Sequence, residues 1–330
     1  MSQTKAQLIS GTATQDLTVD NINTTSVNSG QLSNRNLFIN GAMLVWQRGV
    51  SGGTASNYLC DRFWCAGTGI SHARSTDAPA GFKYSTKVTH GGNALSIGQP
   101  IELCATGSSQ PMVAGEKITV SFYAKVDSGT TESSVLLKFR DSKFSSTNEV
   151  SFTSDTGNAT FTTSWQRFTK TFTIPTVGGT NVMAAFELSG IDRTAYFTGF
   201  QMELGDKATD FEHRAFHDEL LRCQRYYYHS YNYGTYPGAN SDRGCIHVMA
   251  FNGAFIRIRA ASSCPMRTNP TVTQYSTDGT ANKWKNRDTG SNVNAGTTGV
   301  GQSGVGLMFM GNTQGSGQHA SCQFVLNAEF

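Results

Sequence analysis

The sequence predicts an all-β protein, made of a β-sandwich, one linking amphipathic helix and a second, smaller β domain. Three observations predict this class. Short segments alternate apolar with polar residues, turn residues separate these segments, and one segment has the period of a helix. Charged residues make up only 15% of the 330 positions, whereas glycine occupies 35 of them. This composition is typical of β structure with many tight turns.

The clearest predicted strand runs from 117 to 126. Every second side chain there is apolar and is expected to face the core, namely Ile118, Val120, Phe122, Ala124 and Val126. Tyr123 and Lys125 are expected on the opposite, polar face. This period of two indicates a half-buried antiparallel strand, and several such segments predict a sandwich.

One segment, 214–229, is predicted to be a helix that links the two β regions. Its apolar residues are spaced four, three and four apart, which is the stripe of an amphipathic helix: Phe216, Leu220, Cys223 and Tyr227. The consecutive tyrosines 226–228 are interpreted as packing and interface residues.

The chain divides into four predicted parts. An assembly arm at 1–35 precedes the sandwich at 36–213, and a helix with a connector at 214–244 leads to a C-terminal β domain at 245–330. The region 276–321 is rich in Gly, Thr and Asn and is expected to form long loops or hairpins.

The predicted arm is too short to form a core of its own. Its apolar residues are sparse within a polar stretch, and they include Leu17, Val19 and Ile22. A disordered tail and an arm that orders against another copy or a partner both fit this pattern. The regular apolar positions favour the arm.

Charge and cysteine content exclude several classes of protein. A formal net charge of +3 is too weak to indicate nucleic-acid binding, which needs a clustered basic face. No apolar stretch is long enough to insert into a membrane, and no signal peptide is recognised at the start. Seven cysteines, an odd number, do not suggest a disulfide framework. We therefore expect synthesis in a reducing cytoplasm with free thiols.

The usual metal and nucleotide motifs are absent or lack their context. Gly299 to Gly304 fits G-x-G-x-x-G, but no strand-then-helix pattern surrounds it. Cys60 and Cys65, and the pair Cys245 and His247, do not form halves of a zinc cluster, and buried thiols are the preferred interpretation. No metal and no cofactor is expected.

Catalytic motifs are also missing, and no enzymatic activity is expected. A glycosidase needs two carboxylates close together. No local pattern pairs the available candidates, which include Glu102, Glu187 and Glu203.

Aromatic residues suggest a different kind of site. Sugars bind proteins by stacking on aromatic rings while polar groups contact the hydroxyls. Tyr123 and Lys125 on the polar face of their strand are candidate ligand-binding residues, as is Trp284, which is expected to be exposed in a polar loop. The remaining tryptophans are assigned to the core: Trp46, Trp64 and Trp165.

Several phrases in the sequence resemble a known family. The ordered set is similar to the jelly-roll carbohydrate-binding modules of phage tail fibres and other virion appendages, a fold also attached to bacterial glycan-degrading enzymes. The phrases are NLFINGAMLVWQRG at 36–49, CDRFW at 60–64, EKITVSFYAKV at 116–126, SWQRFTKTFTIP at 164–175 and FQMELGDKATDFEHR at 200–214.

The resemblance continues beyond the module. ELLRCQRYY at 219–227, CPMRTNPTVTQYSTDG at 264–279 and the closing FVLNAEF are similar to the segment and the small C-terminal β domain that follow the module in phage proteins. Many sugar-binding members hold calcium through an acidic residue in the strand before Glu-Leu-Gly. Residues 196–200 carry no carboxylate, so calcium is not expected.

The resemblance implies a structural protein of a bacteriophage virion, made in the host cytoplasm. It implies a homotrimer that contacts other virion proteins through the arm and attaches to host-surface polysaccharide through the jelly roll. Two alternatives stay open. One is a ligand-free capsid-decorating, head-fibre or tail-structural protein, and the other is a polysaccharide depolymerase.

Overall fold

A computed structural model describes residues 34–329 except for several internal segments. These are 54–56, 68, 90–93, 103–114, 141–148, 152–156, 174–180, 190, 192, 250–256 and 311–316. The predicted arm residues Leu17, Val19 and Ile22 lie outside the described residues. Within the described residues, no helix has the length and apolar character that crossing a membrane requires.

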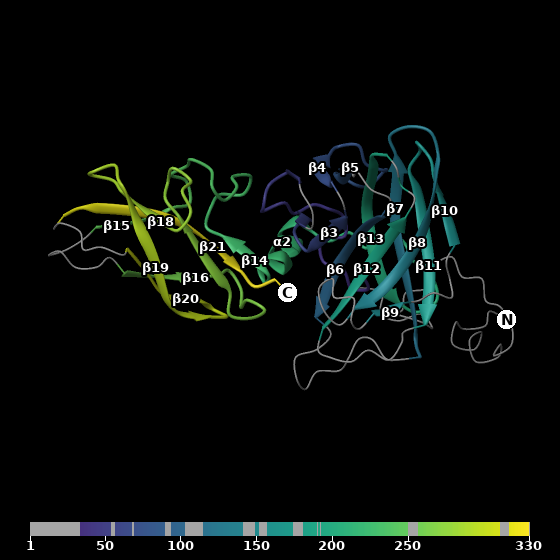
Figure 1. The fold of residues 1–330 in the computed structure, drawn as a ribbon. Coiled ribbons are helices and arrows are strands. Elements are labelled where there is room, and N and C mark those ends of the chain that lie inside the picture. The colour runs from purple at the N-terminus through teal and green to yellow at the C-terminus, as the bar shows by residue number, and fades with distance from the viewer. Residues whose placement is uncertain are drawn as a thin grey trace, which may run out of the picture.

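The first unit is a sandwich of two antiparallel sheets that lie face to face (Figure 1). Among the described residues, one sheet has six strands in the order β1 (Ser51–Gly53), β4 (Ser71–Ser75), β5 (Ser85–Thr89), β13 (Ala195–Leu204), β7 (Lys117–Val126) and β11 (Gln166–Thr173). The other has the order β10 (Gly157–Phe161), β8 (Thr131–Arg140), β12 (Asn181–Ser189), β6 (Ala94–Glu102), β3 (Phe63–Gly67) and β2 (Asn57–Cys60), with β9 (Glu149–Ser151) paired to β8.

Strands far apart in the sequence are neighbours in both sheets, as in a jelly roll. The central strand β7 lies between β13 and β11, and all its pairings are antiparallel. The side chains predicted to face inward are buried between the sheets: Ile118, Val120, Phe122, Ala124 and Val126. The predicted all-β sandwich and the inward face of this strand are confirmed.

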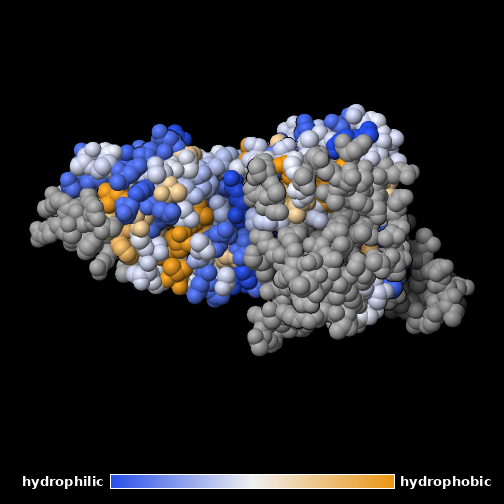
Figure 2. Space-filling view, viewed as in Figure 1, coloured by the Kyte–Doolittle hydropathy of each residue, from blue (hydrophilic) through white to orange (hydrophobic). Residues whose placement is uncertain are grey.

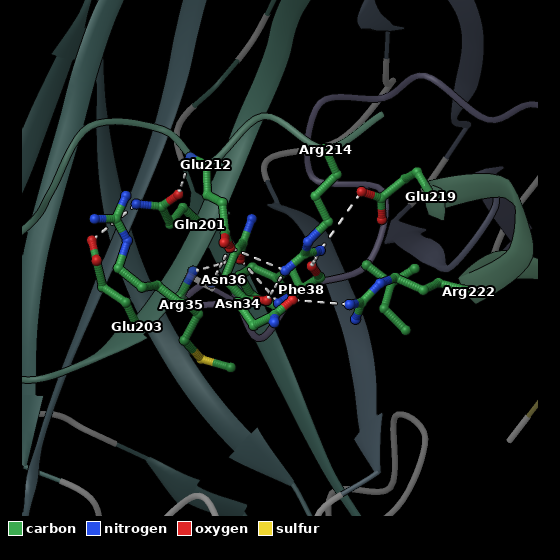
Figure 3. Close-up of polar contacts among 12 residues, drawn as sticks. Asn34, Arg35, Asn36, Phe38, Gln201, Glu203, Glu212, Arg214, Glu219 and Arg222 are labelled. Carbon is green, nitrogen blue, oxygen red and sulfur yellow. Dashed lines mark hydrogen bonds and ion pairs between the residues drawn. The ribbon is translucent and has the colours of Figure 1, made fainter. Parts of the chain in front are cut away.

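The N-terminal end of the described chain closes the first unit against the residues that follow β13 (Figure 3). Arg214 donates from Nη1 to the carbonyl oxygen of Phe38 at 3.0 Å. The Glu212 carboxylate accepts the backbone N–H of Asn36 at 2.9 Å. Glu219 lies 3.6 Å from Arg214, so the helix that begins at 216 is fixed to this cluster.

The helix α2 (Phe216–Gln224) is shorter than the predicted 214–229. Tyr227 fits the helical stripe, but its backbone belongs to β14 (Tyr227–His229), where it pairs with Asn327. Sheet pairing therefore ends the helix. The predicted stripe is also only partly right, because Cys223 is buried whereas Phe216 is 42% exposed. Tyr226 and Tyr227 are buried between the two units, as predicted for packing residues.

The second unit is a smaller β structure around one central strand, β21 (His319–Asn327). Among the described residues its sheet runs β14, β21, β18 (Lys283–Asn286), β19 (Asn292–Gly301), β20 (Gly304–Met310) and β16 (Arg257–Ala261). Two further strands, β15 (Ile246–Met249) and β17 (Thr271–Tyr275), pair with β21. Figure 2 shows apolar residues gathered on one face of this unit between hydrophilic bands. The helix α2 and the C-terminus both lie between the two units (Figure 1).

Candidate functional site

The outer face of the six-stranded sheet carries a row of four residues from neighbouring strands. Lys87 on β5 and Lys125 on β7 are both register partners of Tyr196 on β13. Trp165 directly precedes Gln166, which pairs with Ala124, so it extends the row on the far side of β7. We call Lys87, Tyr196, Lys125 and Trp165 the ring row.

Ammonium groups and aromatic rings alternate along the ring row. The Lys87 Nζ atom lies 5.8 Å from the Tyr196 ring centroid. The Lys125 Nζ atom lies 5.0 Å from the Tyr196 centroid and 5.7 Å from the Trp165 ring. These distances are within the range of cation–π attraction. The two rings meet edge to face, with centroids 6.4 Å apart.

Asp77, from the loop between β4 and β5, fixes one end of the ring row. Its Oδ1 accepts the indole N–H of Trp165 at 3.0 Å, and its Oδ2 pairs with the Lys125 ammonium. Partial burial opposes ionisation, but the hydrogen bonds from Lys125 and Trp165 outweigh it and lower the pKa of Asp77. The loop itself is anchored by the Ser85 hydroxyl, which donates to the Asp77 carbonyl at 2.5 Å.

Tyr123 lies beside the ring row, one step along β7. Its ring packs against Phe82, with centroids 5.3 Å apart, and the Arg167 guanidinium lies 5.8 Å from the same ring. Gly199 provides the space for this packing, because a Cβ there would come within 2.8 Å of both Tyr123 and Phe82. Tyr123 is therefore half-buried and supports the site from the side.

Two of the three predicted ligand-binding residues thus lie together, and the third lies elsewhere. Lys125 belongs to the ring row and Tyr123 adjoins it. The prediction that Trp284 is exposed in a polar loop is wrong. Trp284 is completely buried on β18, where its indole N–H donates to Gln274.

The composition around Trp284 explains the error. The polar, glycine-rich residues that follow it form a strand, β19, and not a loop. Because β18 pairs with both β19 and β21, one of its faces is turned into the core of the second unit. A buried ring on that face cannot stack on a ligand.

Trp165 and Tyr196 are the site residues that the sequence interpretation missed. Trp165 was predicted to be in the core, which is wrong, because it is only partly buried and lies on the outer face. A signal was present in the sequence. Phe168 and Phe172 face inward on β11, so residues an odd number of positions away face outward, as Trp165 and Arg167 do.

The carboxylates considered for glycosidase chemistry are separated from the ring row. Glu102 pairs with Arg225 at 2.8 Å, at the junction of the two units. Glu203 is buried and accepts the backbone N–H of Thr209 at 2.8 Å. The side chain of Glu187 lies outside the described residues. Among the described carboxylates, Asp77 contacts the ring row, and each of its carboxylate oxygens accepts a hydrogen bond from a residue of that row.

Thiols and metals give no further site in the described part of the chain. Cys60 and Cys65 are buried, as predicted. Cys245 is only half-buried, contrary to its interpretation as a buried thiol, and its sulfur lies 2.9 Å from His247 Nε2. Within the described residues, no three His, Cys, Asp or Glu side chains are grouped so that they would hold a metal ion.

Comparisons with known proteins find similar folds only among solved structures. No protein-family model and no curated protein matches the sequence. The CBM22-1 xylan-binding domain of Xyn10C from Paenibacillus barcinonensis is similar at 14% identity, over 56% of this chain and 100% of that domain, with a TM-score of 0.36. The C-terminal family 22 carbohydrate-binding module of Clostridium thermocellum Xyn10B gives 15% identity over 48% and 97%, with a TM-score of 0.35.

A phage protein is also among the similar structures. The enzymatically active domain of tailspike protein 4 of bacteriophage CBA120 matches at 16% identity over 52% of this chain and 21% of that chain, with a TM-score of 0.33. Similarity at this level concerns the fold alone. The β-sandwich of this chain is established by its own strand order.

Proposed function

We propose that this chain binds a polysaccharide through the ring row of its jelly roll and serves as a non-catalytic structural protein of a bacteriophage particle. The observation that carries the proposal is the alternation of Tyr196 and Trp165 with two ammonium groups on one open sheet face. Sugar rings stack on aromatic faces, while ammonium and carboxylate groups bind hydroxyls.

The way in which the rings are held supports a binding role. Asp77 fixes the indole of Trp165 and the ammonium of Lys125 at once. Groups that are already ordered lose little conformational entropy when a ligand binds. A sandwich that serves only as a spacer needs no such arrangement on its outer face.

A non-catalytic role agrees with the charges around the rings. Hydrolysis of a glycosidic bond uses a pair of carboxyl groups across the bond. Asp77 is the described carboxylate in contact with the ring row, and its hydrogen bonds favour the ionised form over the protonated form that a general acid requires.

The virion setting is supported by the phrases that resemble phage appendage proteins. Two of these phrases meet in space, because Asn36 donates from Nδ2 to the Phe200 carbonyl at 2.9 Å. This contact closes the sandwich, so the two phrases have an architectural role. In this proposal the chain forms a homotrimer, the arm at 1–35 docks it onto other virion proteins, and multivalency strengthens weak sugar binding.

Binding of the purified full chain to surface polysaccharide extracted from host cells tests the sugar-binding role. We expect Trp165→Ala and Tyr196→Ala each to lower the affinity about tenfold, which corresponds to about 1.4 kcal/mol of stacking. Phe216→Ala removes an exposed ring from α2 and serves as the matched control. Unchanged affinity in the Trp165→Ala, Tyr196→Ala double variant would favour a ligand-free architectural protein.

Release of reducing sugar from the same polysaccharide tests the absence of catalysis. We expect none above the background of a heat-denatured sample. Steady turnover that is lost on Asp77→Asn would identify a depolymerase and overturn the structural role.

A further inference from the structure

The charges beside the ring row are predominantly positive. Lys87 is exposed, and no described carboxylate pairs with it. Arg167, one strand step away, donates to the Ser121 hydroxyl at 2.9 Å and to the Thr209 carbonyl, and it has no carboxylate partner among the described residues. Asp77 neutralises only Lys125. The face therefore presents an excess of cationic groups around its rings.

The positions of the cations relative to Tyr196 add geometry to this excess. Lys87 and Lys125 occupy the strands on either side of Tyr196, in register with it. Neighbouring strands are about 4.8 Å apart, so the two lysine backbones lie roughly 10 Å apart across the ring. A sugar stacked on Tyr196 would have an ammonium group within reach of each of its edges.

The two ammonium groups are not equivalent. Lys125 has 15% of its side chain exposed and is already paired with Asp77. Lys87 has no such partner within the described chain, and its ammonium lies over the face of the Tyr196 ring. A carboxylate of a ligand could therefore pair with Lys87 without displacing a carboxylate of the described chain.

We infer that the ring row selects a polysaccharide that contains uronic acids over a neutral polysaccharide, with Lys87 as the residue that recognises the carboxylate. This inference rests on the proposed function. An ammonium and a carboxylate attract each other as opposite charges in addition to forming a hydrogen bond, whereas an ammonium and the hydroxymethyl group of a neutral sugar form the hydrogen bond alone.

The test compares two forms of one polymer. The full chain is titrated with polygalacturonate and with the same polymer after its carboxyl groups have been reduced to alcohols, at low and at high salt. Inorganic polyphosphate serves as a polyanion without sugar rings. We expect the acidic polymer to bind best and its advantage over the reduced polymer to shrink as salt rises.

The variants locate the effect. Lys87→Gln should reduce affinity for the acidic polymer about three- to fivefold more than for the reduced polymer, as expected for one exposed charge pair. Lys87→Arg keeps the positive charge and should retain most of the preference for the acidic polymer over the reduced polymer. Lys283→Gln removes the same charge from the second unit, where Lys283 contacts Asn294, and should leave the ratio of the two affinities as it is in the unmodified chain.

The outcomes separate this inference from the proposed function. Equal binding of both polymers overturns the inference and leaves the proposed sugar binding in place. The same conclusion follows if Lys87→Gln does not change the ratio of the two affinities. Polyphosphate binding as strong as that of the acidic polymer also overturns it, because charge alone would then account for the preference. No binding to either polymer overturns the inference alone, because binding to the host polysaccharide tests the proposed function separately.

Discussion

Glu329 lies with its carboxylate against the guanidinium of Arg62, although 267 positions separate the two residues. Glu329 follows β21 of the second unit, whereas Arg62 precedes β3 of the first. Arg48 holds the other carboxylate oxygen at 3.0 Å. The ring of Tyr226 lies 3.5 Å from the guanidinium carbon of Arg62. This buried cluster joins the two β units, and the residues after β21 are part of the join.

Replacing Glu329 with Gln is expected to lower the free energy of unfolding by roughly 3 kcal/mol. The substitution leaves the guanidinium of Arg62, which is only 1% exposed, without its carboxylate. Breaking a buried pair by removing one partner typically costs about 3–5 kcal/mol. Chemical denaturation followed by tryptophan fluorescence measures the change.

Asp218→Asn provides the control for this substitution. It removes a carboxylate from a largely exposed pair with His217 and should change stability by about 0.5 kcal/mol or less. If both variants lost the same small amount, the pair between Glu329 and Arg62 would contribute no more than a surface contact.

His229, on β14 near this junction, makes stability depend on pH. Burial lowers the pKa of His229 to about 4, compared with 6.5 for a free histidine. The unfolded chain therefore binds a proton between about pH 6.5 and 4 that the folded chain does not. The stabilisation is complete above pH 6.5 and is lost as the pH falls, by about 3 kcal/mol in total.

His229→Phe isolates this effect because phenylalanine keeps a ring between Tyr227 and Tyr231 and cannot be protonated. The difference in unfolding free energy between the variant and the original chain should move in favour of the variant as the pH falls from 6.5 to 4. A difference that stays constant over this range would show that His229 is protonated in the folded chain as readily as in the unfolded chain.

Alternation along one strand was enough to predict much of the fold and part of the site. The inward face of β7 followed directly from the sequence, as did the position of Lys125 on the outer face, although Thr119 and Ser121 on the same side as Lys125 are buried. The remainder of the ring row required knowledge of strand order. Tyr196 and Lys125 become partners only because β13 pairs with β7. Asp77 reaches them from a loop, where no periodic pattern indicates position.

Two kinds of feature could not be predicted from the sequence: ion pairs between distant residues, and strands whose composition is typical of loops. Nothing near Glu329 in the sequence indicates that it pairs with Arg62, because this contact depends on how the two β units pack against each other. The burial of Trp284 was hidden because β19 contains many Gly, Thr and Asn residues, which are typical of loops. Pairing with β18 and β20 overrides this local composition.

Trp284→Ala is expected to destabilise the second unit without reducing the proposed sugar binding. Trp284 is fully buried with Met308 and Cys322, and removal of a large buried ring costs about 3–5 kcal/mol. Trp165→Ala should have the opposite pattern, with weakened binding and nearly unchanged stability. Denaturation curves and affinity for the same polysaccharide, measured on both variants, check the contrast. Loss of binding in a still-folded Trp284→Ala chain would contradict the site assignment.

Gly199→Ala should disturb the packing beside the ring row. Gly199 has a φ of +65° at the irregularity of β13, a conformation that disfavours other residues. A methyl group there would also approach Tyr123 and Phe82 to within 2.8 Å. We expect a loss of about 1–3 kcal/mol in stability and a displaced Tyr123 ring. Gly290→Ala, at a positive φ with open space around it, separates the backbone effect from the steric effect.

Under the proposed virion role, removal of residues 1–33 should leave both β units folded and prevent incorporation into particles. The cut preserves Asn34 and Arg35, which contact Arg222 and the Asp210 carbonyl and so belong to the closed first unit. Near-unchanged denaturation curves would establish that the truncated chain folds. The truncated chain is then expressed in host cells in place of the full chain, and its amount in the purified particles measures its incorporation. Normal incorporation of the folded, truncated chain would show that docking onto the virion does not depend on the arm.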